Sequence, residues 1–318
     1  MFPGRFRPAT TSLSATDERH TIKNSTRTIT GTALAAGLIA LTGCSAGAET
    51  AALENGDEKN ITIAVFNGWD EGIAASVLWQ SVLESEGYDV TLEYADIAPV
   101  FAGLSASDYD LSLDIWLPIT HESYIEQYGD DLTDLGAWNT EAKNAIAVNA
   151  DAPIDSLAEL AENADLFGNR IVGIEPGAGL TLATEGRIIP GYGLEGMDYV
   201  TSSTAAMLTE LTAATEAGEN IAVTLWEPHW AYGEFPIKNL EDPNGEFGDG
   251  ESIHTYAAKD FPENSPTAAG WIENFEMDLD TLYSLEKVLF VDYDGDDYAP
   301  IVEKWIEDNQ DYVDGLTS

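Results

Sequence analysis

The alternation of apolar runs with helical patterns, which begins at Lys59, restricts the fold of this sequence more than any other feature. NITIAVFN and YDVTLEYA have the composition of strands, and EGIAASVLWQSVLESEG between them has the spacing of an amphipathic helix that ends at Gly87. IAPVFAGLSASD then indicates another helix and YDLSLDIWLP another strand. Repeated strand and helix units of this kind predict an α/β fold with a mainly parallel sheet.

The same rhythm starts again after residue 144. NAIAVN, NRIVGIE and NIAVTLWEP indicate strands, and SLAELAENADL and TAAMLTELTAATEAG indicate helices. The turn-rich segment NLEDPNGEFGDGES marks a boundary, and IHTYAAKDF indicates a strand that returns across it. We therefore predict two lobes, with lobe I formed by residues 59–144 and 254–318 and lobe II by residues 145–253. A ligand cleft is expected where strand ends of both lobes face each other.

The charge balance excludes several classes of partner. The chain has 57 acidic and 13 basic residues and a formal net charge of −44, so its field repels nucleic acid phosphates. An aromatic content of 10% and the many apolar runs favour a packed protein over a disordered one. We expect this surface to suit a halophilic environment, because the Debye length falls to about 3 Å at 1 M salt and repulsion between carboxylates is then screened.

The first 44 residues have the pattern of a lipoprotein signal peptide. A basic region precedes the short apolar run GTALAAGLIALTGC, which is shorter than the roughly 20 residues that a permanent membrane helix needs. Cys44 is the only cysteine, and LTGC resembles the lipobox at which the leader is cleaved before a lipid-bearing cysteine. Residues 45–58 are small and polar, as in a flexible tether. We predict an extracytoplasmic protein anchored by lipid at Cys44 to the outer face of the cell membrane.

Three tryptophans follow apolar strands at equivalent points of the pattern, namely Trp69, Trp116 and Trp226. A tryptophan in such a place is often a core residue, but three of them favour a pocket at the mouth of the sheets. Electron-rich ring faces suit a quaternary ammonium group, whose methyl groups prevent it from donating hydrogen bonds. Three such contacts supply about 6 kcal/mol, whereas micromolar binding needs about 8 kcal/mol. A second recognition element is therefore expected.

The segment WDEGIA offers that element directly after Trp69. Gly72 and Ile73 are predicted in the first turn of a helix, where backbone amides lack intrahelical partners and favour an anion. A carboxylate held there, together with a cage of indoles, describes a betaine. The Gly-rich turn GIEPGAGL, with Gly177 and Gly179, is a weaker signal for a supporting role.

A set of motifs, in order along the chain, resembles the signature segments of the glycine betaine-binding proteins of bacterial ABC importers: NGWDEGIA, DIWLPITH, DLGAWN, IVGIEPGAG, SSTAAM, TLWEPHW, LEDPNGEFG and IHTYAAKDF. The resemblance implies a two-lobed type II periplasmic-binding-protein fold with the ligand cleft between its lobes. It also implies ABC permease and ATPase subunits as partners in the uptake of a compatible solute. By motif, Trp116 and Trp226 become cage walls, while Gly72 and Ile73 become the carboxylate cradle.

The sequence departs from the family pattern in the C-terminal third. Members with three cage tryptophans often carry the last one after an NF pair, where this chain has Met277 within ENFEMDLD. Met277 offers a polarizable sulfur in place of a ring face. Trp69 is our candidate for the third wall, because choline-binding relatives have a GW pair at a similar point, and Glu71 then faces a hydroxyl or a cation. Weaker candidates for the third wall are Trp230 and Tyr192.

Catalysis is not indicated by the pattern of polar residues. Glu227 and His229, and likewise His121 and Glu122, are close in sequence, but no nucleophile, metal-binding or phosphate-binding motif accompanies them. We expect the histidines to bond backbone or cleft groups, with His229 able to reach a ligand carboxylate. The prediction is a binding protein without cofactor or metal. Its alternatives are choline, carnitine or proline betaine as ligand, a sensor or adhesion lipoprotein with the same pocket and, remotely, an extracytoplasmic hydrolase.

Overall fold

The computed structural model describes residues 52–318 of the chain. The predicted signal peptide, Cys44 and residues 45–51 of the predicted tether lie outside the described residues. Within 52–318, no helix combines the length and the apolar character that crossing a lipid bilayer requires.

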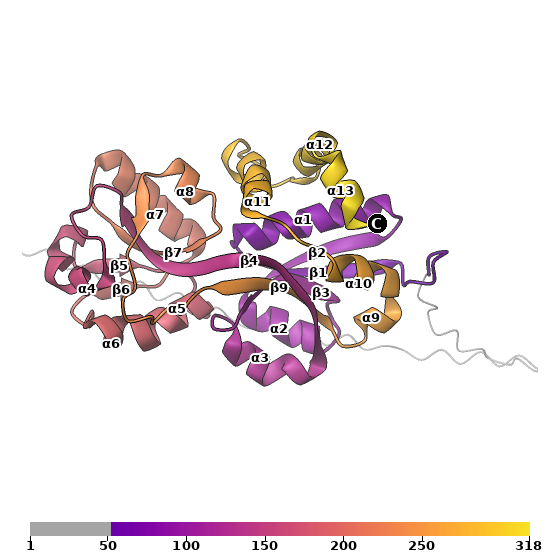
Figure 1. Ribbon diagram of the computed structural model, residues 1–318, viewed down its shortest axis with the longest axis horizontal. Helices are drawn as coiled ribbons and strands as arrows, with labels where there is room; N and C mark the ends of the chain where they lie inside the picture. The colour runs from indigo at the N-terminus through magenta and orange to yellow at the C-terminus, as the bar shows by residue number, and fades with distance from the viewer. Residues whose placement is uncertain (1–51) are drawn as a thin grey trace, which may run out of the picture. The chain divides into compact units, whose positions relative to one another are not determined.

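The strands form one continuous hydrogen-bonded series in the order β2, β1, β3, β9, β4, β7, β5 and β6, with β8 paired to β4 (Figure 1). The neighbours of β1 and of β5 are parallel, as predicted, whereas all neighbours of β4 and β9 are antiparallel. The sheet is therefore mixed: β9 runs opposite to β3 in lobe I, β4 runs opposite to β7 in lobe II, and β4 and β9 run opposite to each other. The strands are β1 (Asn60–Phe66), β2 (Asp89–Ala95), β3 (Leu111–Leu117), β4 (Leu132–Asn149), β5 (Arg170–Val172), β6 (Asp198–Val200), β7 (Ala222–Glu227), β8 (Ile237–Asn239) and β9 (Glu251–Ala258).

Strand β4 connects the two lobes. Its first part, up to Ala142, pairs with β9, and its second part, from Lys143, pairs with β7. The chain returns from β8 through a loop to β9, which pairs only with strands of lobe I. Two segments of chain, one within β4 and one before β9, thus join the lobes.

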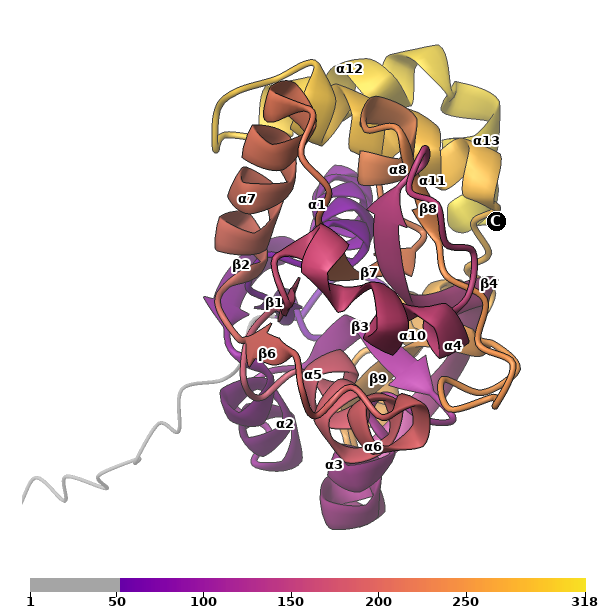
Figure 2. The same cartoon turned by 90° about the vertical axis from the view of Figure 1, so that its left-hand side faces the viewer.

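Helices cover both faces of the sheet in each lobe. In lobe I, α1, α11, α12 and α13 lie on one face, and α2 and α3 on the other (Figure 1). In lobe II, α7 and α8 lie opposite α5 and α6 (Figure 2). The α-helices are α1 (Asp70–Ser85), α2 (Ile97–Ser105), α3 (Glu122–Tyr128), α4 (Leu157–Leu160), α5 (Gly179–Ala183), α6 (Ile189–Tyr192), α7 (Thr204–Ala217), α8 (Ala231–Glu234), α9 (Phe261–Asn264), α10 (Pro266–Glu273), α11 (Leu279–Glu286), α12 (Ala299–Asp308) and α13 (Gln310–Leu316); shorter helical turns are η1 (Gly129–Asp131), η2 (Ala161–Phe167), η3 (Thr184–Ile188) and η4 (Lys287–Val291).

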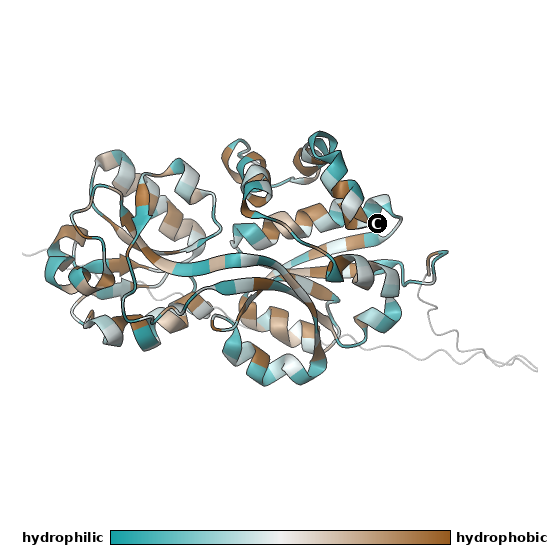
Figure 3. Ribbon diagram, viewed as in Figure 1, coloured by the Kyte–Doolittle hydropathy of each residue, from teal (hydrophilic) through white to brown (hydrophobic). Residues whose placement is uncertain are grey.

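Helix α1 illustrates how the sequence positions the site. Its apolar side chains, among them Leu78, Trp79 and Leu83, are buried, and Figure 3 shows the corresponding apolar positions along the helix and the strands of lobe I. The predicted end of this helix is confirmed, because Gly87 has a φ of 98° and Tyr88 donates its backbone N–H to the carbonyl of Leu83. A left-handed glycine of this kind is a common helix terminator. The opposite end of α1, at Asp70, follows β1 after three residues and lies at the edge of the sheet where β1 and β3 end.

The packed part of the chain begins inside the segment predicted as a tether. Asp57 is fully buried, and its carboxylate accepts hydrogen bonds from the hydroxyl of Tyr88 at 2.7 Å and from the backbone N–H groups of Thr267 and Ala268, both at 3.0 Å. These amides belong to the first turn of α10, which lacks intrahelical acceptors for them. Asp57 therefore fastens the N-terminal end of the described chain to lobe I.

Candidate functional site

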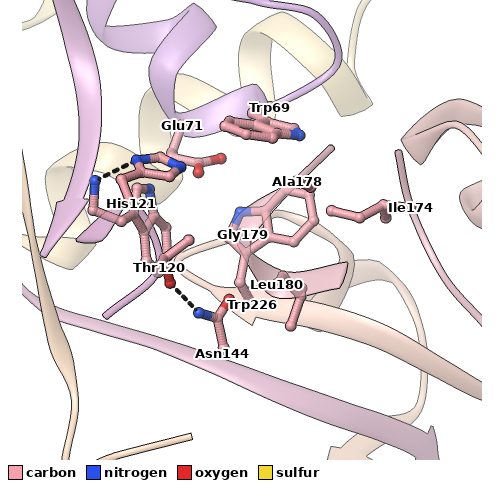
Figure 4. A pocket seen from close by; sticks show the side chains of 11 residues that line it. Trp69, Glu71, Thr120, His121, Asn144, Ile174, Ala178, Gly179, Leu180 and Trp226 are labelled. Atoms are coloured by element: carbon pink, nitrogen blue, oxygen red, sulfur yellow. Dashed lines mark hydrogen bonds between the residues drawn. The ribbon is translucent and has the colours of Figure 1, made fainter. Parts of the chain in front are cut away.

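A small pocket lies between the two lobes, at the ends of their strands (Figure 4). Lobe I and lobe II both contribute, and none of the lining residues is a lysine or an arginine. The lining residues are Trp69, Glu71, Trp116, Thr120, His121, Asn144, Ile174, Ala178, Gly179, Leu180 and Trp226.

Three indoles form most of the aromatic wall. Trp116 is the penultimate residue of β3, Trp226 is the penultimate residue of β7, and Trp69 is the N-cap residue of α1, three positions after β1 ends. All three are buried, with 3%, 3% and 7% of their surface exposed. The structure thus brings together the three tryptophans that the strand-end pattern singled out, one from lobe II and two from lobe I.

The walls from lobe I are held by their neighbours. The indole N–H of Trp116 donates to Oδ1 of Asp114 at 2.7 Å, and its backbone N–H donates to Nδ1 of His121 at 2.9 Å. Trp69 stacks on His121 with ring centroids 5.7 Å apart and an interplanar angle of 14°, and it packs against Phe66 at 4.7 Å. Each ring is therefore fixed in orientation before any ligand arrives.

Within the described part of the chain, the wall from lobe II lacks the indole hydrogen bond that fixes Trp116, and the same is true of Trp69 in lobe I. Trp226 packs edge-on against His229, with ring centroids 4.9 Å apart and an angle of 81°. Its indole Nε1 is buried and finds no hydrogen-bond partner among residues 52–318. A buried N–H of this kind normally has a partner, and it lies near enough to the carboxyl group of Glu71 to lower the pKa of that group, so it can donate to Glu71 or to a ligand acceptor.

His121 adds a second donor to the pocket. Its Nδ1 accepts the backbone N–H of Trp116, so Nδ1 carries no proton. Burial lowers the pKa of His121 to about 3, which makes the ring neutral and places its single proton on Nε2. Nε2 is buried and is not bonded to any residue of the described chain. His121 therefore presents an N–H group that the sequence analysis had not assigned to the site.

Glu71 gives the pocket its only acidic lining residue. The side chain comes from the first turn of α1 and reaches into the space between Trp69 and Trp226 (Figure 4). It is 1% exposed, and burial raises the pKa of its carboxyl group to about 8. Oε2 of Glu71 is another buried atom without a partner in the part of the chain that the structure describes.

The predicted carboxylate cradle does not face the pocket. The backbone N–H of Ile73 donates to the carbonyl of Trp69 at 3.0 Å, as the fourth helical residue normally does. Gly72 faces β3, where an added Cβ would lie 2.5 Å from Oδ2 of Asp114. The first turn of α1 is therefore packed against the Asp114 side chain, and neither Gly72 nor Ile73 lines the pocket.

Other predicted residues lie at varying distances from the cavity. Met277 is buried beside Trp138, whose carbonyl accepts its backbone N–H at 2.9 Å, and it lines a separate surface groove. His229 lies behind Trp226, with Nδ1 accepting the N–H of Ala231 at 3.1 Å and Nε2 3.9 Å from Oδ2 of Asp70. The remaining predicted residues are placed as follows: Gly179 lines the pocket, Gly177 lines the adjoining groove, Trp230 donates to Asp70, and Tyr192 donates to Asp242.

A polar network joins the pocket to the connection between the lobes. Glu251, the first residue of β9, is buried and accepts the backbone N–H groups of Ile119 at 3.0 Å and Thr120 at 2.8 Å. It also accepts the hydroxyl of Thr120 and the amide of Asn144, the latter at 2.9 Å. Thr120 and Asn144 both line the pocket, and they are bonded to each other (Figure 4). The sequence analysis had missed all three polar residues of this network.

Close contact between the lobes occurs at Gly179. An added Cβ there would collide with the backbone carbonyl of Thr120, so only glycine allows the start of α5 to approach the loop after β3. The glycine-rich turn is therefore used for close packing of lobe II against lobe I beside the pocket.

Two lobes joined by β4 and the segment before β9, with an indole-lined pocket between them, define the class of two-lobed periplasmic binding proteins. The chain belongs to the family described as the substrate binding domain of ABC-type glycine betaine transport systems, which matches residues 59–308. This family is a class of substrate-binding proteins.

Individual relatives agree with this assignment. The chain is 37% identical over 164 residues to the glycine betaine/carnitine transport binding protein GbuC of Listeria monocytogenes, a match that covers 51% of this chain and about half, 52%, of the relative. Lactococcal OpuAC, solved in a closed conformation with glycine betaine, is 28% identical with a TM-score of 0.75, covering 82% of this chain and 100% of that one. The glycine betaine/L-proline-binding protein ProX of Borrelia burgdorferi is 28% identical with a TM-score of 0.76, covering 82% and 97%.

Proposed function

We propose that this chain is the extracytoplasmic solute-binding component of an ABC importer and that its ligand is glycine betaine or a closely related quaternary ammonium osmolyte. One observation carries the proposal: three indoles from two lobes surround a small pocket whose lining includes no lysine or arginine. GbuC and OpuAC, whose names or bound ligand include glycine betaine, support the choice of ligand class.

The aromatic wall suits the methylated end of such a ligand. A quaternary nitrogen cannot donate hydrogen bonds, so a protein recognises it through the negative faces of aromatic rings. Each desolvated contact contributes about 2 kcal/mol, and all three rings are already buried and largely fixed by their neighbours. Little ordering of side chains then opposes binding.

The polar end of the pocket suits a carboxylate. The N–H groups at Nε2 of His121 and Nε1 of Trp226 are both buried and free of partners within the described residues. A hydrogen bond to a charged acceptor contributes about 1.5–3 kcal/mol, so these two donors supply what the cage alone lacks. In this proposal they take the role that the sequence analysis gave to the amides of Gly72 and Ile73.

The transport step follows from the two-lobed architecture. Ligand-dependent closure about the segments near Ala142 and Glu251 encloses the solute, and an ABC permease with its ATPase then receives it for uptake under osmotic stress. We further propose the division into residues 59–144 with 254–318 and residues 145–253, the lipid anchor at Cys44 and the halophilic habitat. Mass spectrometry of the mature N-terminus, with Cys44→Ala as control, tests the anchor.

Calorimetric titration in high salt tests the ligand. Glycine betaine is expected to bind, whereas 3,3-dimethylbutyrate, which has the same shape and carboxylate but a neutral carbon in place of nitrogen, is expected to bind at least about 100-fold more weakly, because two or more cation–π contacts are lost. Equal affinity for the two compounds, or no binding of any quaternary ammonium compound, would contradict the proposal. Recovery of the ligand unchanged after incubation separates binding from hydrolysis.

Choline is the second candidate, and Glu71 is the observation that favours it. Choline keeps the methylated nitrogen but carries a hydroxyl in place of the carboxylate, and the carboxyl group of Glu71 in the pocket is a suitable partner for a hydroxyl or a net positive charge. Titration with choline beside glycine betaine ranks the two ligands.

A further inference from the structure

An excess of buried acid surrounds the first turn of α1. Asp70 and Glu71 belong to that turn, Asp114 approaches it from β3, and Glu286 approaches it from α11. Both carboxyl oxygens of Glu286, Oδ2 of Asp114 and Oε2 of Glu71 are buried without a hydrogen-bond partner in the described chain. The salt bridges among residues 52–318 include no lysine or arginine bound to any of these four groups.

Such a cluster is costly to ionise. A buried carboxylate without a countercharge or donors either retains its proton or awaits a cation. The other titratable groups that face the cluster include two histidines and two tyrosines. Burial lowers the pKa of His121 and of His229 to about 3 and raises the pKa of Tyr283 and of Tyr298, so all four are neutral at pH 7 and supply no positive charge. Any positive charge at this place must therefore come from a ligand.

Only one member of the cluster reaches the ligand pocket. Glu71 lines the pocket, whereas Asp70 accepts the indole N–H of Trp230 at 2.5 Å, Asp114 accepts that of Trp116, and Glu286 lies under α1. The carboxyl group of Glu71 is thus the single acidic group that a ligand contacts directly.

On this basis, and resting on the proposed function, we infer that Glu71 exchanges its proton with solvent according to the charge of the ligand. With Glu71 protonated, the pocket takes a zwitterion, whose carboxylate accepts the O–H of Glu71. With Glu71 ionised, the same pocket takes a cation, and the proton is released to the buffer. Glu71 therefore sets the preference between glycine betaine and choline according to pH.

Whether the affinity for a ligand rises or falls with pH depends on the protonation state of Glu71 in the ligand-free protein. The pKa of Glu71 is raised to about 8 by burial, so at pH 7 the free protein holds the proton. A bound cation lowers that pKa, and affinity for the cation then rises by up to about tenfold per pH unit until pH 8 is passed. A bound zwitterion keeps the proton in place, and its affinity falls once the free protein loses that proton above pH 8.

Titrations at pH 7 and pH 9 test the inference. This window avoids Asp70, whose pKa burial raises to about 6, and both histidines, whereas burial raises the pKa values of Asp114 and Glu286 well above their ordinary range, so variants must separate these two acids from Glu71. Between the two pH values the affinity for choline is expected to rise about tenfold and that for glycine betaine to fall about tenfold. At pH 7, choline binding should also release close to one proton, measured as the dependence of the binding heat on the ionisation enthalpy of the buffer.

Two variants complete the experiment. Glu71→Gln cannot ionise, so the affinities for choline and for glycine betaine should both become independent of pH between pH 7 and pH 9. Glu286→Gln removes a buried acid that does not line the pocket. In this variant the affinities for choline and for glycine betaine should depend on pH as they do in the wild type. The inference would be overturned if the affinities of Glu71→Gln still changed with pH. It would also be overturned if the wild type bound both ligands with the same affinity at pH 7 and pH 9 and released no proton. Either result would leave the proposed function standing. Absence of binding by either ligand at both pH values would overturn both.

Discussion

The end of β3 in lobe I and the end of β7 in lobe II carry the same short pattern. Each has a tryptophan, one further residue and a cis proline; a histidine follows the proline directly at His229 and after two further residues at His121. In both, Nδ1 of the histidine accepts a backbone N–H group, from Trp116 in lobe I and from Ala231 in lobe II. The two ends differ in what holds the indole.

The difference concerns the indole N–H groups and the loops behind them. The N–H of Trp116 is bonded to Asp114, and the loop after β3 is held by Glu251, whereas the N–H of Trp226 has no partner in residues 52–318. A side chain that is already fixed loses little conformational entropy when the ligand binds, and an N–H group without a protein partner can donate a hydrogen bond to the ligand. Trp116 is therefore fixed in advance, whereas Trp226 in lobe II and Trp69 in lobe I each have an indole N–H group available to a ligand.

The largest expected effect comes from removing either ring. Trp116→Ala and Trp226→Ala should each weaken ligand binding by at least about 2 kcal/mol, roughly 30-fold, because a cation–π contact and its desolvation are lost. Calorimetric titration measures both. If either variant titrates like the wild type, that ring belongs to the core and not to the pocket wall.

Glu251→Gln should make the lobe I end less rigid and so more like the lobe II end. One acceptor oxygen becomes an NH₂ group that faces other donors, and we expect a loss of about 1–3 kcal/mol in unfolding free energy together with weaker ligand binding. Chemical denaturation and calorimetry provide the measurements. The matched control is Glu216→Gln on the exposed surface of α7, which should change neither quantity; an equal effect in both variants would refute the role of Glu251.

Glu71→Gln should stabilise the ligand-free protein at pH 8. The folded pKa of about 8 lies above the ordinary value of 4.5, so the folded state binds the proton more tightly, and stability is lost as pH rises from about 4.5 to 8. The variant removes this loss, and the gain at pH 8 should exceed about 1.4 kcal/mol, the equivalent of one pKa unit. Thermal melts at pH 5 and pH 8 check it, with the exposed Glu84→Gln of the same helix as control. An equal gain in stability at pH 5 and pH 8 would show that Glu71 does not ionise between these two pH values in the folded protein.

The smallest effect separates the two indole N–H groups. Trp116→Phe removes a donor to Asp114, whereas Trp226→Phe removes a donor that has no partner within the described structure. The first variant should therefore lose about 1 kcal/mol more unfolding free energy than the second. Urea denaturation of the ligand-free variants compares them, and equal losses would show that the two ends are held alike.

The sequence predicted those parts of the site that depend on local pattern. Apolar runs followed by turn residues located the strand ends, and the three tryptophans of these ends line one pocket. Strand and helix alternation likewise predicted the two-lobed fold, which the comparison with OpuAC and ProX confirms. These features are encoded within a few neighbouring residues, so no tertiary contact is needed to recognise them.

The rest depends on contacts between distant segments. The rule for helix starts located the first turn at Gly72, but the direction that this turn faces is set by Asp114 on β3. Glu251, Thr120 and Asn144 meet only because β9, the loop after β3 and β4 converge where the lobes join. Nothing in the neighbourhood of any one of these residues in sequence indicates the other two.

The fastening of Asp57 has a mechanical consequence. Its bonds go to Tyr88 and to α10, both in lobe I, while lobe II is reached only through β4 and the segment before β9. A tension applied to the chain ahead of Asp57 therefore acts first on lobe I. It reaches lobe II only indirectly, through β4, the segment before β9 and contacts such as that of Trp230 with Asp70. Attachment at this end therefore fixes the position of lobe I with little direct force on lobe II.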